Sequence, residues 1–208
     1  MIENVIFDVD GTLWDCSAAV AKAWNAVYER RGLSRRFSVS DVRSCMGLTM
    51  EEIAEKYFCQ TEKTERDEIV QSCIAEQNAL LPKEGGKLYP NIRETLKTLS
   101  ARFGVYIVSN CECGYIETML SFARLESFVD GFLCAGMTGK DKGENLRLLM
   151  AEHALKNCVY VGDTRMDEAA CQKAEIPFIW ASYGFGRPDA PAAVIKDFSE
   201  IPDLLERF

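Results

Sequence analysis

Short apolar runs that end abruptly in polar residues recur along the chain and predict buried strands. The clearest runs cover residues 5–7, 105–108, 159–161 and 178–180, and a weaker one covers 131–134. Their hydrophobicity is continuous rather than alternating, which is typical of strands covered on both faces. The pattern therefore predicts a parallel sheet.

Helical patterns lie between most of these runs. Residues 92–103 repeat apolar side chains at helical spacing and end at Gly104, and residues 144–155 and 167–174 read similarly. Strands that alternate with helices indicate βαβ units, so we expect an α/β fold with a doubly wound, Rossmann-like parallel sheet. In such sheets ligands bind beyond the carboxyl ends of the strands.

One stretch, from about residue 17 to residue 81, departs from this alternation. It contains no convincing strand, and its apolar spacing predicts helices over 18–31, 40–57 and 64–81, followed by a hinge-like Leu-Pro-Lys-Glu-Gly-Gly sequence at 81–86. We expect a small all-helical cap inserted after the first strand, with both of its connections returning to the same place. The predicted domains are an α/β core of residues 1–15 and 85–208 and a cap of residues 16–84.

Composition and charge exclude several function classes. The 208 residues are 48% hydrophobic and 27% charged, an ordinary globular mixture. With 24 basic and 32 acidic residues the formal charge is −8, which argues against binding to nucleic acid or to an anionic membrane. The longest uncharged stretch, 176–186, is too short to cross a membrane, and no secretory signal precedes the first strand. We therefore expect a cytoplasmic protein.

Nine cysteines are present, but they do not predict a disulfide scaffold. Their number is odd, and several lie in apolar helical patterns, which is typical of reduced cysteine used as a small apolar residue. Cys111 and Cys113 form an isolated pair, and the single histidine, His153, lies far away in the sequence. Zinc binding is therefore disfavoured, and any catalysis must rely on carboxylates, lysine, hydroxyls or thiols.

The segment Asp8-Val9-Asp10-Gly11-Thr12 follows the first predicted strand. Residues two apart on a strand face the same side, so the carboxylates of Asp8 and Asp10 can converge on one site. Crowded carboxylates repel each other unless a cation lies between them or one takes up a proton. Taken alone, the pentapeptide is equally compatible with a strand followed by an ordinary Asp-Gly turn.

Further polar residues follow other predicted strands. Ser109 and Asn110 follow the run at 105–108, and Asp163 and Asp167 follow the run at 159–161. Lys140 and Lys142 precede a predicted helix, where either can supply a cation. Four carboxylates, a hydroxyl and a lysine favour a site for a hard cation, with one carboxylate free to act as a nucleophile.

These motifs together resemble the haloacid dehalogenase (HAD) superfamily, in the phosphatase branch with phosphoglycolate phosphatase-like enzymes. The resemblance covers essentially the whole chain. Residues 8–12 match the first motif, Ser109-Asn110 the second, and Gly162-Asp163-Thr164 with Asp167 the fourth. The third motif is a lysine before a helix, which we assign to Lys142, with Lys140 as the alternative.

The resemblance implies a Mg²⁺-dependent phosphatase that acts on small phosphorylated metabolites through an aspartyl-phosphate. Asp8 would be the nucleophile and Asp10 the general acid and base, while Ser109 and Lys142 would contact the phosphoryl group. Magnesium would be held by Asp8, the backbone carbonyl of Asp10 and Asp163, with Asp167 orienting the ligands. The remaining expected substrate contacts are Thr12, Asn110 and, in the cap, Arg43 and Gly47.

Two other functions stay open on these residues. A phosphomutase of the β-phosphoglucomutase type would use the same core and return the phosphate to a sugar. A phospho-receiver or other phosphate-binding module also clusters acidic residues and a lysine, although it needs neither Asp10 nor a cap. The substrate itself is not encoded in any motif, and both a monomer and a homodimer are compatible with the sequence.

Overall fold

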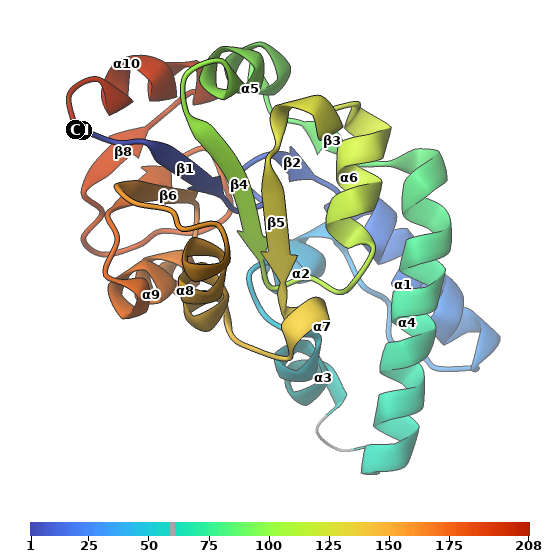
Figure 1. Cartoon of the computed structure of the whole chain (residues 1–208). Coiled ribbons are helices and arrows are strands. Elements are labelled where there is room, and N and C mark those ends of the chain that lie inside the picture. Colours follow the sequence, from blue (N-terminus) through green and yellow to red (C-terminus); the bar gives the residue numbers. More distant parts are fainter. Residues whose placement is uncertain (59–60) are drawn as a thin grey trace.

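The computed structural model describes residues 1–58 and 61–208 and is built around a six-stranded parallel sheet (Figure 1). The strand order is β5-β4-β1-β6-β7-β8. The strands are β1 (Asn4–Phe7), β4 (Gly104–Ser109), β5 (Gly131–Cys134), β6 (Cys158–Gly162), β7 (Phe178–Ala181) and β8 (Ala193–Ile195). The predicted α/β class and all five predicted strands are confirmed, while β8 is an addition. The chain winds outward from β1 in both directions, so the switch point lies at β1.

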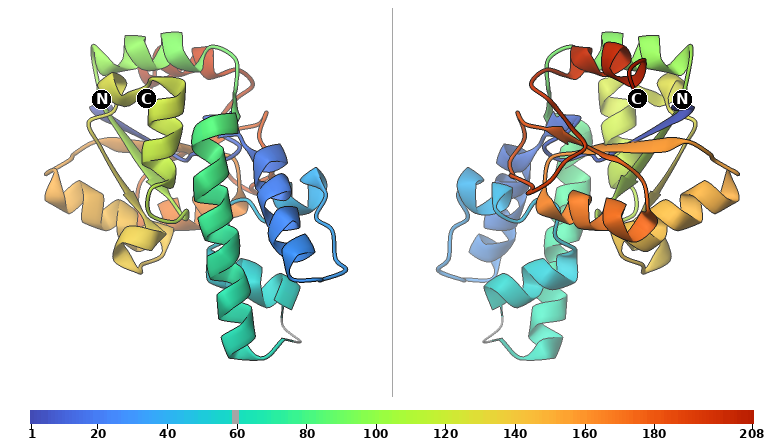
Figure 2. Two further views of the ribbon diagram at one scale, coloured as in Figure 1. Left: turned by 90° about the vertical axis from the view of Figure 1, so that its right-hand side faces the viewer. Right: turned by 90° about the vertical axis from the view of Figure 1, so that its left-hand side faces the viewer.

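Alternate residues of the strands point to opposite faces of the sheet, and each face has its own apolar core. Ile6, Tyr106 and Tyr160 pack under α8 (Lys142–Glu152) and α9 (Arg165–Ala174). Their neighbours, such as Phe7 and Ile107, belong to the larger core on the other face. Helices α5 (Ile92–Ser100), α6 (Tyr115–Ala123) and α10 (Ile201–Leu205) cover that face, as Figure 2 shows. Burial on both faces explains the continuous hydrophobicity of the strands.

Helices α8 and α9 both begin at defined caps. The Asp141 side chain accepts a hydrogen bond from the Glu144 amide and starts α8. Thr164 and Asp167 form a reciprocal capping box that starts α9. Such caps satisfy amides that the helix itself leaves unpaired, so they fix where each helix begins. They thereby fix the positions of Lys142 and Asp167 beside the sheet.

In the described part of the stretch without a predicted strand, four helices are present. They are α1 (Ser17–Arg30), α2 (Val39–Arg43), α3 (Met50–Phe58) and α4 (Lys63–Glu84). Helices α1 and α4 pack along each other beside the sheet (Figure 2). The segment that leads from the sheet into these helices and the segment that returns from them pair as antiparallel strands, β2 (Trp14–Asp15) with β3 (Lys87–Leu88). The division into core and cap domains stays a prediction.

Two sequence-based predictions in this stretch, one of a helix and one of a hinge, were wrong in detail. The expected helix over 40–57 is split into α2 and α3, because Gly47 adopts a left-handed φ of +90° in the turn between them. The hinge-like sequence at 81–86 is mostly helical, since α4 continues through Pro82 to Glu84. Pro82 lies in the last turn, where α4 is about to end in any case.

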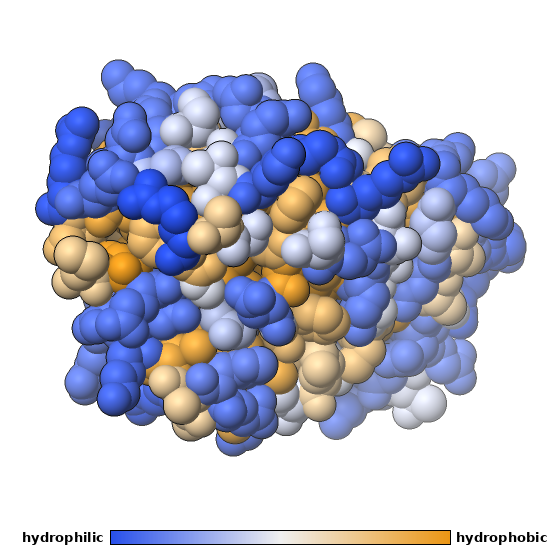
Figure 3. Space-filling model, turned by 45° about the horizontal axis from the view of Figure 1, so that its top comes forward, coloured by the Kyte–Doolittle hydropathy of each residue, from blue (hydrophilic) through white to orange (hydrophobic). Residues whose placement is uncertain are grey.

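Short elements complete the chain. They are α7 (Ala135–Thr138) and the 3₁₀ turns η1 (Glu126–Phe128) and η2 (Phe198–Glu200). The face in Figure 3 carries mostly hydrophilic side chains, with apolar patches between them. Within residues 1–58 and 61–208, no helix is long and apolar enough to cross a membrane. The eight cysteines of the described part are all free thiols, in agreement with their interpretation as reduced residues.

Candidate active site

Polar side chains gather at the carboxyl ends of three adjacent strands. Asp8 directly follows β1, Ser109 ends β4, and Asp163 follows β6. All three are at least 96% buried. The topology places them together, because β1 lies between β4 and β6 and all three strands are parallel. Their position agrees with the rule that ligands bind at the switch point of such sheets.

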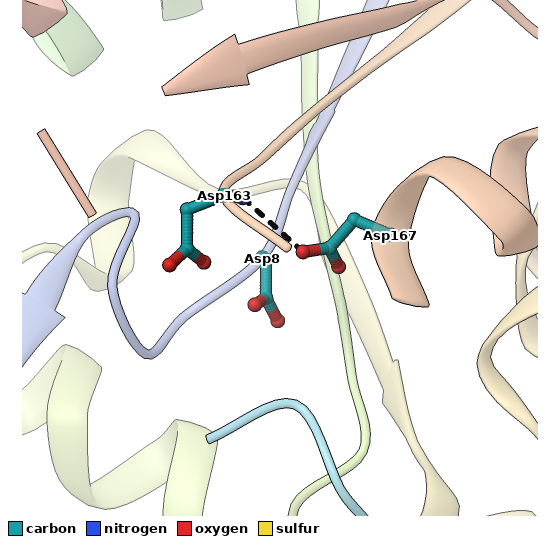
Figure 4. Close-up of side chains that lie close together, drawn as sticks. All are labelled: Asp8, Asp163 and Asp167. Atoms are coloured by element: carbon teal, nitrogen blue, oxygen red, sulfur yellow. Dashed lines mark hydrogen bonds between the residues drawn. The ribbon is translucent and has the colours of Figure 1, made fainter. Parts of the chain in front are cut away.

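Asp8, Asp163 and Asp167 form a buried group of carboxylates (Figure 4). One oxygen of each lies within 4.8 Å of one oxygen of the others. The Lys142 ammonium bridges two of them, with Nζ 2.9 Å from Asp8 Oδ1 and 2.6 Å from Asp167 Oδ1. Lys140 is exposed. The structure therefore brings Lys142, and not Lys140, to the acidic group.

The three carboxylates differ in how fully their oxygens are occupied. Asp167 accepts hydrogen bonds from Lys142 Nζ, from Tyr160 Oη at 3.3 Å, and from the amides of Asp163 and Thr164 at 3.1 and 2.8 Å. Thr164 Oγ1 adds a further bond at 2.7 Å. In contrast, Asp163 Oδ2 accepts one bond from the Phe185 amide at 2.6 Å, and its Oδ1 lies 3.5 Å from Thr12 Oγ1. The oxygens of Asp167 are thus occupied by hydrogen bonds within the protein, whereas those of Asp163 keep free lone pairs.

The pKa values of these groups follow from burial and from the single ammonium. Burial raises the pKa of Asp8 to about 7, with the ammonium of Lys142 opposing this and the charge of Asp167 adding to it. Burial and the charges of Asp167 and Asp8 raise the pKa of Asp163 well above its usual value. Burial also acts on Asp167, but Lys142 and the bonds from Thr164 outweigh it and lower its pKa. The charged forms of Asp8 and Asp163 are therefore the ones that burial, together with the neighbouring carboxylates, makes costly.

This donor set fits a hard divalent cation. Three buried carboxylates share one ammonium, so the group carries excess negative charge that burial makes costly. A cation between Asp8 and Asp163 would relieve that cost, and carboxylate oxygens are the ligands that Mg²⁺ and Ca²⁺ prefer. The buried acidic group can hold a metal ion of this kind.

Asp10 belongs to a separate hydrogen-bond network that the sequence did not indicate. Its Oδ1 accepts a bond from Tyr115 Oη at 2.6 Å and one from Cys16 Sγ at 3.3 Å, and Cys16 Sγ itself lies 2.6 Å from Tyr115 Oη. Burial raises the pKa of Asp10 to about 6, while these two bonds work against the shift. Asp10 is therefore held in one orientation by residues from α6 and from the start of α1.

A cleft extends from the acidic group toward the helical segment. Asp8, Asp10, Ser109 and Asn110 line it on the sheet side, and Gly47 lies on the opposite wall. Asn110 Nδ2 donates to the Gly47 carbonyl at 2.8 Å, which ties the turn after α2 to the end of β4. Asn110 Oδ1 is buried and has no partner among the described residues. It is available as a hydrogen-bond acceptor.

Two other predicted substrate contacts, Thr12 and Arg43, lie outside the cleft that contains Asp8. Thr12 is fully buried and faces Asp163 rather than the cleft. Arg43 pairs with Asp15 at 2.5 Å, and its guanidinium lies 5.6 Å from the centre of the Phe185 ring. It lines a neighbouring depression and is absent from the cleft that contains Asp8. The structure therefore does not bring Arg43 together with Asp8, Asp10 and Ser109.

The sequence also contains a signal for the role of Asp167 at the start of α9. Thr164 and Asp167 stand in the T-x-x-D order of a capping box, which predicts that Asp167 is bound by backbone amides. No comparable pattern marks Tyr115 or Cys16. They reach the site through long-range packing.

Known proteins resemble the chain in sequence and structure. Residues 5–181 match the family model of the haloacid dehalogenase-like hydrolases. A protein named phosphoglycolate phosphatase from Photobacterium profundum is 28% identical, covering 99% of this chain and 96% of its own length. Another of that name from Rhodobacter capsulatus is 26% identical, covering 99% and 98%. The crystal structure of a predicted phosphoglycolate phosphatase from Haemophilus somnus has a TM-score of 0.86 at 20% identity over 98% of both chains.

Proposed function

The chain belongs to the family of haloacid dehalogenase-like hydrolases, and we propose that it is a Mg²⁺-dependent phosphatase that hydrolyses small phosphate monoesters through an aspartyl-phosphate. One observation carries the proposal: Asp8 and Asp10 line the same cleft, and Asp8 also belongs to the buried acidic group bridged by Lys142. A carboxylate nucleophile, a second acid and a cation site thus meet at one point. The names of the relatives support the same activity.

In this proposal, Asp8, Asp163 and the backbone carbonyl of Asp10 would hold the ion. When bound, Mg²⁺ supplies positive charge that lets an anionic carboxylate approach an anionic phosphoryl group. Asp167 binds Lys142 and the amides that follow β6, so it keeps the lysine and Asp163 in position. Lys142 balances the charge of Asp8 and of the phosphoryl oxygens, and the Ser109 hydroxyl donates to one of these oxygens.

The first step forms a bond from Asp8 to phosphorus and breaks the bond from phosphorus to the ester oxygen. Asp10 donates its proton to that oxygen, so the product leaves as a neutral alcohol. The elevated pKa of Asp10, about 6, keeps part of this carboxyl protonated near neutral pH. The hydrogen bond from Tyr115 fixes the side chain so that its proton is delivered toward the cleft.

The second step reverses the role of Asp10. Its carboxylate removes a proton from a water molecule, the oxygen of that water attacks phosphorus, and the bond to Asp8 breaks. Inorganic phosphate is released and Asp8 returns to its carboxylate form. We assign residues 16–84 as the cap that closes over the cleft, because α1 to α3 supply the wall opposite Asp8.

The experiment measures the hydrolysis of 4-nitrophenyl phosphate by the purified protein with Mg²⁺, with and without EDTA. We expect EDTA to abolish turnover and Asp8→Asn to lower kcat by at least about 10³-fold. Asp203→Asn, an exposed carboxylate on α10, is the matched control and should keep full activity. Borohydride reduction of the quenched enzyme should convert residue 8 to homoserine. Unchanged hydrolysis in EDTA or in Asp8→Asn would contradict the mechanism.

A further inference from the structure

The wall of the cleft opposite the acidic group is apolar. Its apolar side chains come from α1, α2, α3 and the turn between α2 and α3, and they include Val20, Trp24, Val42, Leu48, Met50 and Ile53. One uncharged polar residue, Gln77 of α4, also lines the cleft. A phosphate monoester whose phosphorus lies at Asp8 must place its alcohol portion against this wall. Apolar surface favours ligands that themselves have apolar surface to bury.

The cleft also lacks positive charge. Among the described residues that line it, none is lysine, arginine or histidine. Two cations beside the cleft are already engaged: Lys142 with Asp8 and Asp167, and Arg43 with Asp15. Beyond Asp8 and Asp10, the one ionisable carboxyl group on the lining is that of Glu112. A carboxylate or a second phosphate on the alcohol would therefore be desolvated without a counter-ion.

The cleft nevertheless offers neutral hydrogen-bonding groups. Asn110 Oδ1 and Trp24 Nε1 are both buried and have no partner among the described residues, and both side chains line the cleft. The bond from Asn110 Nδ2 to the Gly47 carbonyl leaves Oδ1 as an acceptor. One acceptor and one donor suit a hydroxyl or an amide, which are uncharged groups. Unpaired buried groups of this kind favour a ligand that pairs them.

From these observations we infer that the substrate is a phosphate monoester of an uncharged, largely apolar alcohol, and not of an anionic one. The inference rests on the proposed phosphatase function and narrows it. It separates this chain from the substrate that the names of its relatives imply, since phosphoglycolate carries a carboxylate on its alcohol portion. It also disfavours the phosphomutase alternative, because a sugar bisphosphate brings a second dianionic group into the same cleft.

The test compares two substrates of the same shape, 4-carbamoylphenyl phosphate and 4-carboxyphenyl phosphate, with phosphoglycolate and its amide as a second pair. We expect kcat/KM to be at least about tenfold higher for the neutral member of each pair. Met50→Lys places an ammonium on the apolar wall and should reduce this preference or reverse it. Met137→Lys, at an exposed position on α7 outside the cleft, is the matched control and should leave the ratio unchanged.

The outcomes separate the two levels of the inference. If the protein hydrolyses both members of a pair and kcat/KM is equal or greater for the anionic member, the inferred substrate class is wrong, while the proposed phosphatase activity is supported. An unchanged ratio in Met50→Lys also counts against it, because the wall then does not contact the alcohol. If the protein hydrolyses neither pair, nor 4-nitrophenyl phosphate with Mg²⁺, the proposed function fails and the substrate class fails with it.

Discussion

Asp163 and Asp167 lie four residues apart and look alike in sequence, but the structure predicts opposite effects when each is replaced by asparagine. Asp167 is the buried partner of Lys142 and accepts bonds from Thr164 and from the Asp163 amide. Asp163 accepts one short bond, from the Phe185 amide, which an asparagine oxygen can also accept. Loss of charge at 167 therefore breaks a network, whereas at 163 it removes a charge that burial and the neighbouring carboxylates make costly.

The magnitudes follow from the ion pair and from the direction of the pKa shifts. Removing one partner of a buried ion pair costs about 3–5 kcal/mol, and we expect the lower end for Asp167→Asn because Lys142 keeps its contact with Asp8. Asp163 has a raised pKa in the folded state, so its charge lowers stability above the pKa of the unfolded chain, near 4. Asp163→Asn removes this penalty at pH 7. We expect the free energy of unfolding to stay equal or rise by up to about 1 kcal/mol.

Urea unfolding at pH 7, followed by tryptophan fluorescence, measures both effects. In EDTA, Asp167→Asn should lose about 3 kcal/mol and Asp163→Asn should lose nothing. Adding Mg²⁺ should then stabilise the parent by RT ln(1 + [Mg²⁺]/Kd) and Asp163→Asn much less, because that variant lacks a free carboxylate of the proposed ion site. Equal losses for the two variants in EDTA, or equal stabilisation of Asp163→Asn and the parent by Mg²⁺, would refute the reasoning.

Three further predictions concern the groups around the acidic site. Tyr115→Phe removes a hydrogen-bond donor that orients Asp10, so it should lower kcat about tenfold for alkyl phosphates. The loss should be much smaller for 4-nitrophenyl phosphate, because its leaving group needs no acid. An equal loss of kcat on both substrates would contradict this role and indicate general damage to the protein. At saturating Mg²⁺, whose charge keeps the nucleophile Asp8 ionised, the single-turnover rate of alkyl ester cleavage should fall as pH rises through about 6, because only protonated Asp10 donates. Asp10→Asn should flatten this profile. A Cβ at Gly11 would collide with Asp163 Oδ2, so Gly11→Ala should weaken Mg²⁺ activation about 10- to 100-fold. Gly114 has a similar φ of +85°, but a Cβ there would meet open space, so Gly114→Ala is the matched control and should leave Mg²⁺ activation unchanged.

The central sheet could be predicted from the sequence because its strands are buried on both faces. Such strands leave a local signal, a continuous apolar run that stops at a polar residue. The exception, β8, has three residues, and Val194 among them is 45% exposed, so its pattern is too short and too mixed to recognise. The split between α2 and α3 was missed because the apolar spacing continues across Gly47, while the backbone there turns.

The acidic group could be predicted for a related reason. Asp8 and Asp163 directly follow strands that pair in parallel, so the topology alone brings them together. The choice of Lys142 over Lys140 depends on one local feature, the cap at Asp141, which makes Lys142 the first residue of α8. In contrast, Tyr115 reaches Asp10 across 105 residues of sequence. Nothing local marks such a contact, because it depends on how α6 packs over the sheet.

The least predictable part of the site is the wall of the cleft, and a physical difference between its two sides accounts for this. On the sheet side, charges act over several ångströms in a buried environment, so few residue types can occupy those positions and motifs result. On the helical side, any apolar side chain of suitable size contributes about 25 cal/mol for each Å² that it buries, so many sequences serve equally well. The proposed recognition of the phosphoryl group therefore leaves motifs in the sequence. The inferred selection of the alcohol would depend instead on the absence of charge from a surface that forms only when the chain folds.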